Sequence, residues 1–162
     1  MDLNELRENK HGKKILIMKR EIKFRGKRID NSAWVYGDLI HLGNGCIIYH
    51  GSQENYEITS RTDVAIELLD DEISVVRPET VGQFTEIPTS DGGDAEEIYE
   101  HDIVGFIELD EHVIAEVIFE NGCFCFRDKD GQIYYPQNVD CISLLGNKFD
   151  NHGLLEGGSD EE

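Results

Sequence analysis

The sequence predicts a mainly β protein with little helix. Three observations lead to this prediction: short segments in which apolar and charged residues alternate, the β-branched and aromatic content of those segments, and the Gly, Asn and Asp residues between them. Hydrophobic residues make up 39% of the 162 residues, which is enough for a modest core. The length suits one domain or two small ones, and no internal repeat is visible in the sequence.

The first half of the chain is expected to be β-rich. Ile22 and Phe24 alternate with charged neighbours, which predicts a strand, and residues 33–40 predict a second one. The turn residues at 30–32 lie between them, so a hairpin is the expected arrangement. Further along, the sequence predicts a turn at 43–45, strands at 46–49, 56–59 and 73–76, either a helical turn or an acidic loop at 63–69, and a short helix or turn starting at Pro78.

An acidic, glycine-rich loop at 89–97 marks the best domain boundary, and the pattern after it is all β. Asn121-Gly122 is typical of a type I′ hairpin turn. Five short strands joined mostly by tight turns predict a small SH3-like barrel; they are expected at 103–109, 112–120, 123–127, 132–135 and 141–149, with a turn at 110–111. The expected organisation is an N-terminal extension at 1–17, a β-rich part at 18–90, the barrel at 91–152 and a disordered acidic tail at 153–162.

The net charge of −19 is divided unevenly along the chain. Residues 1–28 contain ten bases and four acids and so carry +6, whereas the remainder carries −25. The basic arm, residues 1–28, is compatible with three interpretations: a solvated tail, a segment that binds nucleic acid, or a segment that docks on an acidic body, its own or a neighbour's. The acidic body repels phosphate, so nucleic acid is not expected to bind there, although such a body can imitate the phosphate backbone.

The sequence contains no motif for catalysis, a metal or a cofactor. The cysteines (Cys46, Cys123, Cys125 and Cys141) form no C-x-x-C pair, so reduced, mostly buried thiols are expected. No G-x-S-x-G elbow, Walker A loop or G-x-G-x-x-G helix start occurs. His101-Asp102 is the one adjacent acid–base pair at the start of a strand, and we interpret it as a turn. No signal peptide or membrane-length apolar stretch is found, so a cytoplasmic location is expected.

Five blocks of the sequence together resemble the YopX family of small phage and prophage proteins. The blocks are residues 19–26, 34–39, 78–85, 97–104 and 145–147, and the resemblance extends from about Met18 to Leu155. It implies a β-rich N-terminal part and an SH3-type C-terminal barrel, but no reaction, catalytic residue or cofactor. Three features depart from the family pattern: residues 1–17 precede its usual start, which leaves Met1 or Met18 as the first residue; the loop at 90–96 is unusually acidic; and His101 replaces a usual Gly.

Four aromatic residues within these blocks are the candidate binding residues: Trp34, Tyr36, Phe84 and Tyr99. Since aromatic side chains bury the most area, we expect them to anchor the core or the joint between the two parts, or else to form a recognition surface. The expected function is a non-catalytic protein-binding module of phage origin with a protein partner, and exposed strand edges make a homo-oligomer compatible with it. The alternatives are an acidic DNA mimic that inhibits a host DNA-binding protein, a nucleic-acid binder that uses the basic arm, and an uncharacterised enzyme.

Overall fold

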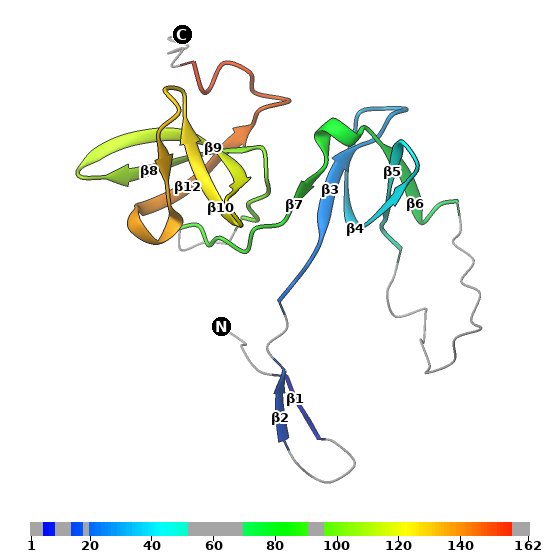
Figure 1. The fold of residues 1–162 in the computed structure, drawn as a ribbon. Helices are drawn as coiled ribbons and strands as arrows, with labels where there is room; N and C mark the ends of the chain where they lie inside the picture. The colour runs from blue at the N-terminus through cyan, green and yellow to red at the C-terminus, as the bar shows by residue number, and fades with distance from the viewer. Residues whose placement is uncertain (1–4, 9–13, 18–19, 52–69, 91–95, 157–162) are drawn as a thin grey trace.

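The computed structural model describes residues 5–8, 14–17, 20–51, 70–90 and 96–156. These residues form two five-stranded antiparallel sheets and a separate two-stranded hairpin (Figure 1). The helices in the described part are two short 3-10 turns. The prediction of a mainly β protein is therefore confirmed. The strand expected at 56–59 and the segment at 63–69 lie outside the described residues.

The first sheet has the strand order β6-β5-β4-β3-β7. Its members are β3 (Phe24–Lys27), β4 (Trp34–Leu42), β5 (Gly45–Tyr49), β6 (Ile73–Val76) and β7 (Gly82–Gln83), with the 3-10 helix η2 (Pro78–Thr80) between the last two. Lys27 pairs with Trp34, which confirms the predicted β3–β4 hairpin. The short helix expected at Pro78 is confirmed by η2.

This sheet rolls into a small barrel, because β6 also contacts the chain that continues β3. Arg28 forms a bridge with Val76, and the Ile29 amide donates a hydrogen bond to the Val75 carbonyl over 3.1 Å. The interior holds the buried side chains of Cys46, Ile48 and Val76. A Cβ at Gly26 would lie 3.0 Å from Val76, so a glycine is what lets β3 approach this strand closely.

The second sheet has the order β11-β10-β9-β8-β12. Its strands are β8 (Asp102–Glu108), β9 (Glu111–Glu120), β10 (Cys123–Asp128), β11 (Ile133–Tyr134) and β12 (Asp140–Asn147). Asn121 and Gly122 have φ angles of 51° and 83°, so the predicted type I′ turn is confirmed. The preceding turn lies at Leu109–Asp110, one residue before the predicted position, because Glu108 pairs with Glu111.

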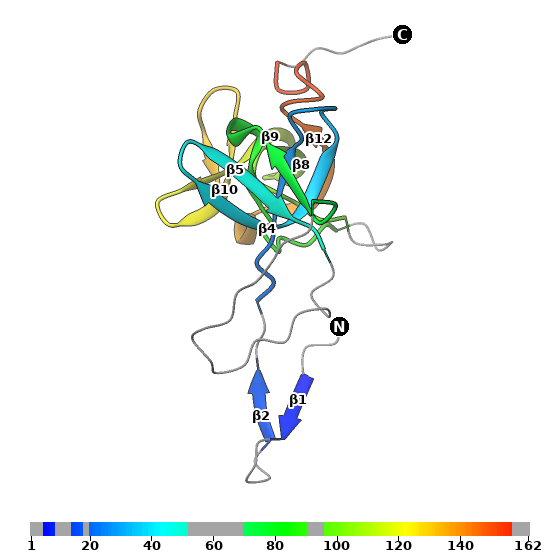
Figure 2. The ribbon, with the colours of Figure 1, turned by 90° about the vertical axis from the view of Figure 1, so that its right-hand side faces the viewer.

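The two sheets share one topology. In each, four strands follow one another as a meander, and the fifth strand returns to pair with the first. In each, a 3-10 helix that starts with proline precedes the fifth strand; in the second sheet this helix is η3 (Pro136–Asn138). The hairpin of β1 (Glu5–Glu8) and β2 (Lys14–Ile17) lies apart from both sheets in Figure 1 and Figure 2.

The chain passes to the second sheet directly after β7. Phe84 forms a bridge with Tyr99, and the Thr85 amide donates to the Ile98 carbonyl over 2.9 Å. The Ser90 amide also reaches the second sheet, at the Ile142 carbonyl. Residues 84, 85 and 90 thus already contact the second half of the chain, and the boundary at 90/91 stays a prediction. At the other end, residues 153–156 of the expected disordered tail form turns.

Candidate functional site

One face of β3, together with Lys23 just before it, holds the two sheets together. Residues at alternate positions of an extended chain point to the same side, and here three bases share that side. Each forms an ion pair with an acid of the second unit. This arrangement matches one of the alternatives for the basic arm, namely docking on the protein's own acidic body. The pairs are Lys23–Glu97, Arg25–Asp102 and Lys27–Asp150.

The central pair, Arg25 with Asp102, is buried. Arg25 is 6% and Asp102 1% exposed, and Arg25 Nη2 lies 2.6 Å from Asp102 Oδ1. The guanidinium carbon lies 4.5 Å from the ring centroid of Trp34 and 4.9 Å from that of Tyr99. Arg25 Nε has no hydrogen-bond partner among the described residues. Burial raises the pKa of Asp102, and the nearby Arg25 charge opposes this shift without cancelling it.

The structure brings the four predicted aromatic residues to this joint. Tyr99 is buried, and its ring centroid lies 5.5 Å from Tyr36 and 5.4 Å from Phe84. The Trp34 ring also contacts Arg25, and its Nε1 donates a hydrogen bond to Asp150 over 2.8 Å. Their place at the joint is thus established. The Arg25–Asp102 pair was not predicted, although the alternation of Lys23, Arg25 and Lys27 is visible in the sequence.

A hydrogen-bond chain runs along the edge of the joint. The Tyr99 hydroxyl donates to Glu97 Oε2 over 2.8 Å, and the same carboxylate pairs with Lys23. Burial and the Glu97 carboxylate raise the pKa of Tyr99. Burial opposes the ionisation of Glu97, but the hydrogen bonds from Lys23 and Tyr99 outweigh it and lower its pKa. The Lys23 ammonium also lies over the Phe84 ring, 4.8 Å from its centroid. These contacts fix both the aromatic and the charged side chains.

The ion-pair partners of His101 and Asp102 are different residues, Glu116 and Arg25 respectively. His101 Nδ1 lies 3.3 Å from Glu116 Oε1, and Lys148 Nζ lies 2.8 Å from the same oxygen. Burial opposes the ionisation of Glu116, but His101 and Lys148 together lower its pKa to about 2. His101 has a φ angle of 71°, the left-handed conformation in which a glycine is less strained. The Asp102 amide donates to the Tyr99 carbonyl, which agrees with the predicted turn.

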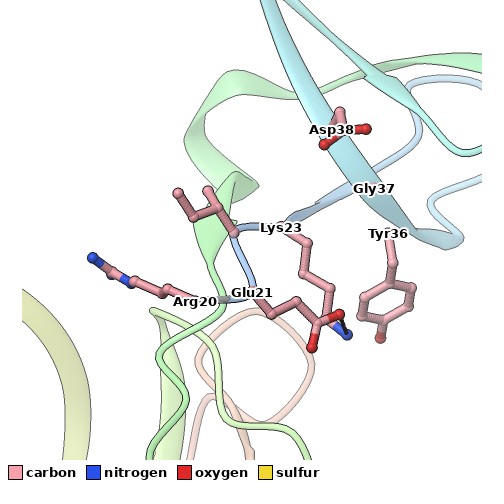
Figure 3. Close-up of a pocket in the computed structure, with 7 residues that line it drawn as sticks. Arg20, Glu21, Lys23, Tyr36, Gly37 and Asp38 are labelled. Atoms are coloured by element: carbon pink, nitrogen blue, oxygen red, sulfur yellow. Dashed lines mark ion pairs between the residues drawn. The ribbon is translucent and has the colours of Figure 1, made fainter. Parts of the chain in front are cut away.

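An open cleft of about 570 Å³ lies beside the joint (Figure 3). We call it the β3–β4 cleft, because the segment that precedes β3 forms one wall and β4 the other. Its lining residues are Arg20, Glu21, Ile22, Lys23, Tyr36, Gly37 and Asp38. Ile22 is 58% and Tyr36 45% exposed. In Figure 3 the Glu21 and Lys23 side chains extend toward Tyr36, whereas Arg20 extends in the opposite direction. The cleft therefore combines exposed apolar area with charges of both signs.

The described residues contain no group of three or more His, Cys, Asp or Glu side chains arranged to hold a metal ion. All four cysteines are free thiols. Cys46 and Cys125 are buried, but Cys123 and Cys141 are exposed, so the expectation of mostly buried thiols is only half met. Burial raises the pKa of the Cys125 thiol, which makes it a weak nucleophile.

No helix in the described part of the chain is long and apolar enough to cross a membrane. Comparisons of the chain with protein-family models, with curated proteins and with solved structures gave no match.

Proposed function

We propose that the protein is a non-catalytic module that binds a segment of a partner protein in the β3–β4 cleft. The observation that carries this proposal is the exposure of two large side chains, Ile22 and Tyr36, at a cleft of about 570 Å³. Aromatic and aliphatic anchors in a concave site provide most of the energy in typical protein recognition.

The joint supports this function because it fixes the walls of the cleft before a partner arrives. Tyr36 packs edge-on against the buried ring of Tyr99, and Lys23 is held by Glu21 and Glu97. A site whose side chains are already ordered loses less conformational entropy on binding than a flexible site.

The fold and the family belong to the same proposal. We propose that both units are SH3-like barrels, on the basis of their strand order and of the 3-10 helix before the fifth strand. The blocks that resemble the YopX family supply Arg25, Tyr36, Phe84 and Tyr99 to the joint, which supports phage or prophage origin as an accessory protein. A fold of this kind does not define a ligand by itself, so the cleft carries the functional argument.

The ion pairs of the basic segment favour a protein partner over nucleic acid. All five bases between residues 20 and 28 have a carboxylate within ion-pair distance, so binding phosphate there would require these pairs to break. Besides the three pairs of the joint, these are Arg20–Glu86 and Arg28–Asp30.

The test is a selection of short random peptides on the immobilised full-length protein, followed by affinity measurement for two matched variants. Ile22 and Ile29 are 58% and 56% exposed, and only Ile22 lines the cleft. We expect Ile22→Glu to weaken the binding of selected peptides by about tenfold or more, which corresponds to about 1.4 kcal/mol. Ile29→Glu should leave the affinity unchanged. The proposal fails if no peptide is selected, or if both variants bind as the original protein does.

A further inference from the structure

The β3–β4 cleft lies where one strand changes partners. β4 pairs with β3 from Trp34 to Gly37, and it pairs with β5 from Asp38 to Leu42. Beyond Gly37 there is no β3 residue left to pair with, since β3 begins at Phe24, the partner of Gly37. From Asp38 onward, β4 is therefore paired on one side only within the described part of the chain.

Leu39 and His41 direct their backbone groups toward this open side. The two-residue turn between Leu42 and Gly45 makes these flanking residues a hydrogen-bonded pair, so the even-numbered residues of this half of β4 bond to β5. The amide and carbonyl groups of Leu39 and His41 then point away from β5, toward the side of β4 on which β3 pairs with residues 34–37. No backbone hydrogen bond among the described residues joins either of them to a neighbour on that side.

The second sheet shows how the same position is closed when the chain supplies a partner. β9 changes partners in the same way, from β8 to β10. The last hydrogen-bonded pair is Val104–Ala115 between β8 and β9, and Phe24–Gly37 between β3 and β4. Val117 and Leu39 each lie two residues after this pair, so Val117 corresponds to Leu39. The His101 amide donates a hydrogen bond to the Val117 carbonyl over 2.9 Å. In the first sheet the residue at the position of His101 is Glu21, and its amide instead donates a hydrogen bond to Glu86 Oε1 over 2.8 Å.

We propose that an extended basic segment of a partner protein adds to the first sheet as a strand, pairing with β4 at Leu39 and His41. Addition of a strand to an open sheet edge is a common mode of peptide recognition, in which main-chain hydrogen bonds provide affinity and alternate side chains provide specificity. This proposal rests on the proposed function and names the class of its partner.

The charge around the cleft selects a basic segment. Two bases of the lining, Arg20 and Lys23, form ion pairs with three acids, namely Glu21, Glu86 and Glu97. The local excess is thus negative, and the whole chain carries −19. Lysine or arginine side chains on the added strand complement this field, while apolar side chains on its other face meet Ile22 and Tyr36.

The first experiment is an N-methyl scan of the tightest peptide from the selection described above. Strand addition predicts that methylation at every second amide weakens binding by about tenfold or more, and that methylation at the positions between leaves it unchanged. The peptide should contain Lys or Arg, and its affinity should fall as salt is added. A scan without this period of two overturns strand addition but leaves the proposed function intact, provided that Ile22→Glu still weakens binding.

The second experiment removes the donor on the protein. His41→Pro deletes an amide that the β4–β5 ladder does not use, and His41→Ala deletes the same exposed side chain but keeps the amide. We expect about tenfold weaker peptide binding for His41→Pro and none of this loss for His41→Ala. Equal affinities for the two variants overturn the proposal. In the original protein, hydrogen exchange at the Leu39 and His41 amides should slow on peptide addition, so the test survives if the proline variant does not fold.

Two further outcomes decide the identity of the occupant. If no peptide is selected and the original protein sediments as a dimer that His41→Pro converts to a monomer, the edge is occupied by a second copy, and the proposal of a basic partner is wrong. If no peptide is selected and the protein is monomeric, both the proposed function and strand addition are overturned.

Discussion

Arg25 Nη2 lies 2.6 Å from Asp102 Oδ1, and this buried contact connects the first strands of the two sheets. Asp102 is further held by the Tyr99 amide, which donates a hydrogen bond to Oδ2 over 2.7 Å. Arg25 donates a second hydrogen bond to the Glu100 carbonyl over 3.3 Å. The two sheets are thus joined through charged groups that water does not reach.

Removing one partner of this pair should destabilise the protein strongly. Asp102→Ala leaves the Arg25 charge buried without a counter-ion, so we expect the free energy of unfolding to fall by about 3–5 kcal/mol. Urea unfolding measures the change, with the exposed Asp140→Ala as the control. The double variant Arg25→Met, Asp102→Leu should recover part of the loss. A loss of less than about 1 kcal/mol for Asp102→Ala would contradict the assignment.

Glu116 should contribute to acid unfolding. Its pKa in the folded protein is lowered from 4.5 to about 2, so its contribution to stability is present above about pH 4.5 and is lost as the pH falls toward about 2. Glu116→Gln should therefore unfold with a shallower pH dependence in this window. Urea midpoints across the window test this, with Glu120→Gln, an exposed position on the same strand, as the control. Parallel curves for the original protein and Glu116→Gln would refute the prediction. Asp102 acts in the opposite direction, because its pKa is raised.

His101 should tolerate glycine better than alanine. Its φ angle of 71° costs a residue with a Cβ about 1 kcal/mol or more, whereas glycine adopts this angle freely. Both substitutions remove the contacts with Glu116 and Phe149, so the difference between them isolates the backbone. We expect His101→Gly to be more stable than His101→Ala by about 1 kcal/mol in thermal or urea unfolding. An alanine variant of equal or greater stability would show that the backbone is not strained.

Gly37 should not accept any side chain. A Cβ at this position would lie 1.9 Å from the Tyr49 carbonyl oxygen, where β4 and β5 come together. Gly37→Ala is expected to cost about 2–3 kcal/mol or more, because a backbone atom and not a flexible side chain must move. Gly45→Ala on the neighbouring strand is the control, since its nearest atom, the Leu42 carbonyl oxygen, lies 3.9 Å away. Similar unfolding midpoints for the two variants would contradict this account.

Local chemistry was sufficient to predict most strands. The alternation around Ile22 and Phe24, and the Asn121-Gly122 turn, act over a few residues, so a single sequence contains the necessary information. The turn at Leu109–Asp110 was misplaced by one residue, because Asp is the more usual turn residue, whereas pairing of Glu108 with Glu111 determines the observed position.

The joint could be predicted only in part. The four aromatic residues were identifiable because they stand in the blocks that resemble the family and because aromatic side chains can bury the most area. The acids that meet Lys23, Arg25 and Lys27 were not identifiable, since the chain contains 34 acids and their pairing depends on the tertiary fold. The β3–β4 cleft was not predicted for a similar reason. It exists because β4 extends beyond the end of β3, and where each strand ends relative to its neighbour depends on the register between them.

The ion pair between Lys27 and Asp150 joins residues that are 123 positions apart, and it has a consequence for the order of synthesis. The ribosome completes the first barrel long before Asp150 is translated, and domains generally fold as they emerge. During that interval Lys27 lacks Asp150, and until Asp102 is translated Arg25 lacks its counter-ion as well, whereas Lys23 already has Glu21 beside it. The nascent chain therefore presents cationic side chains that are paired in the finished protein, and the pairing is complete only when Asp150, beyond the last strand, has been translated.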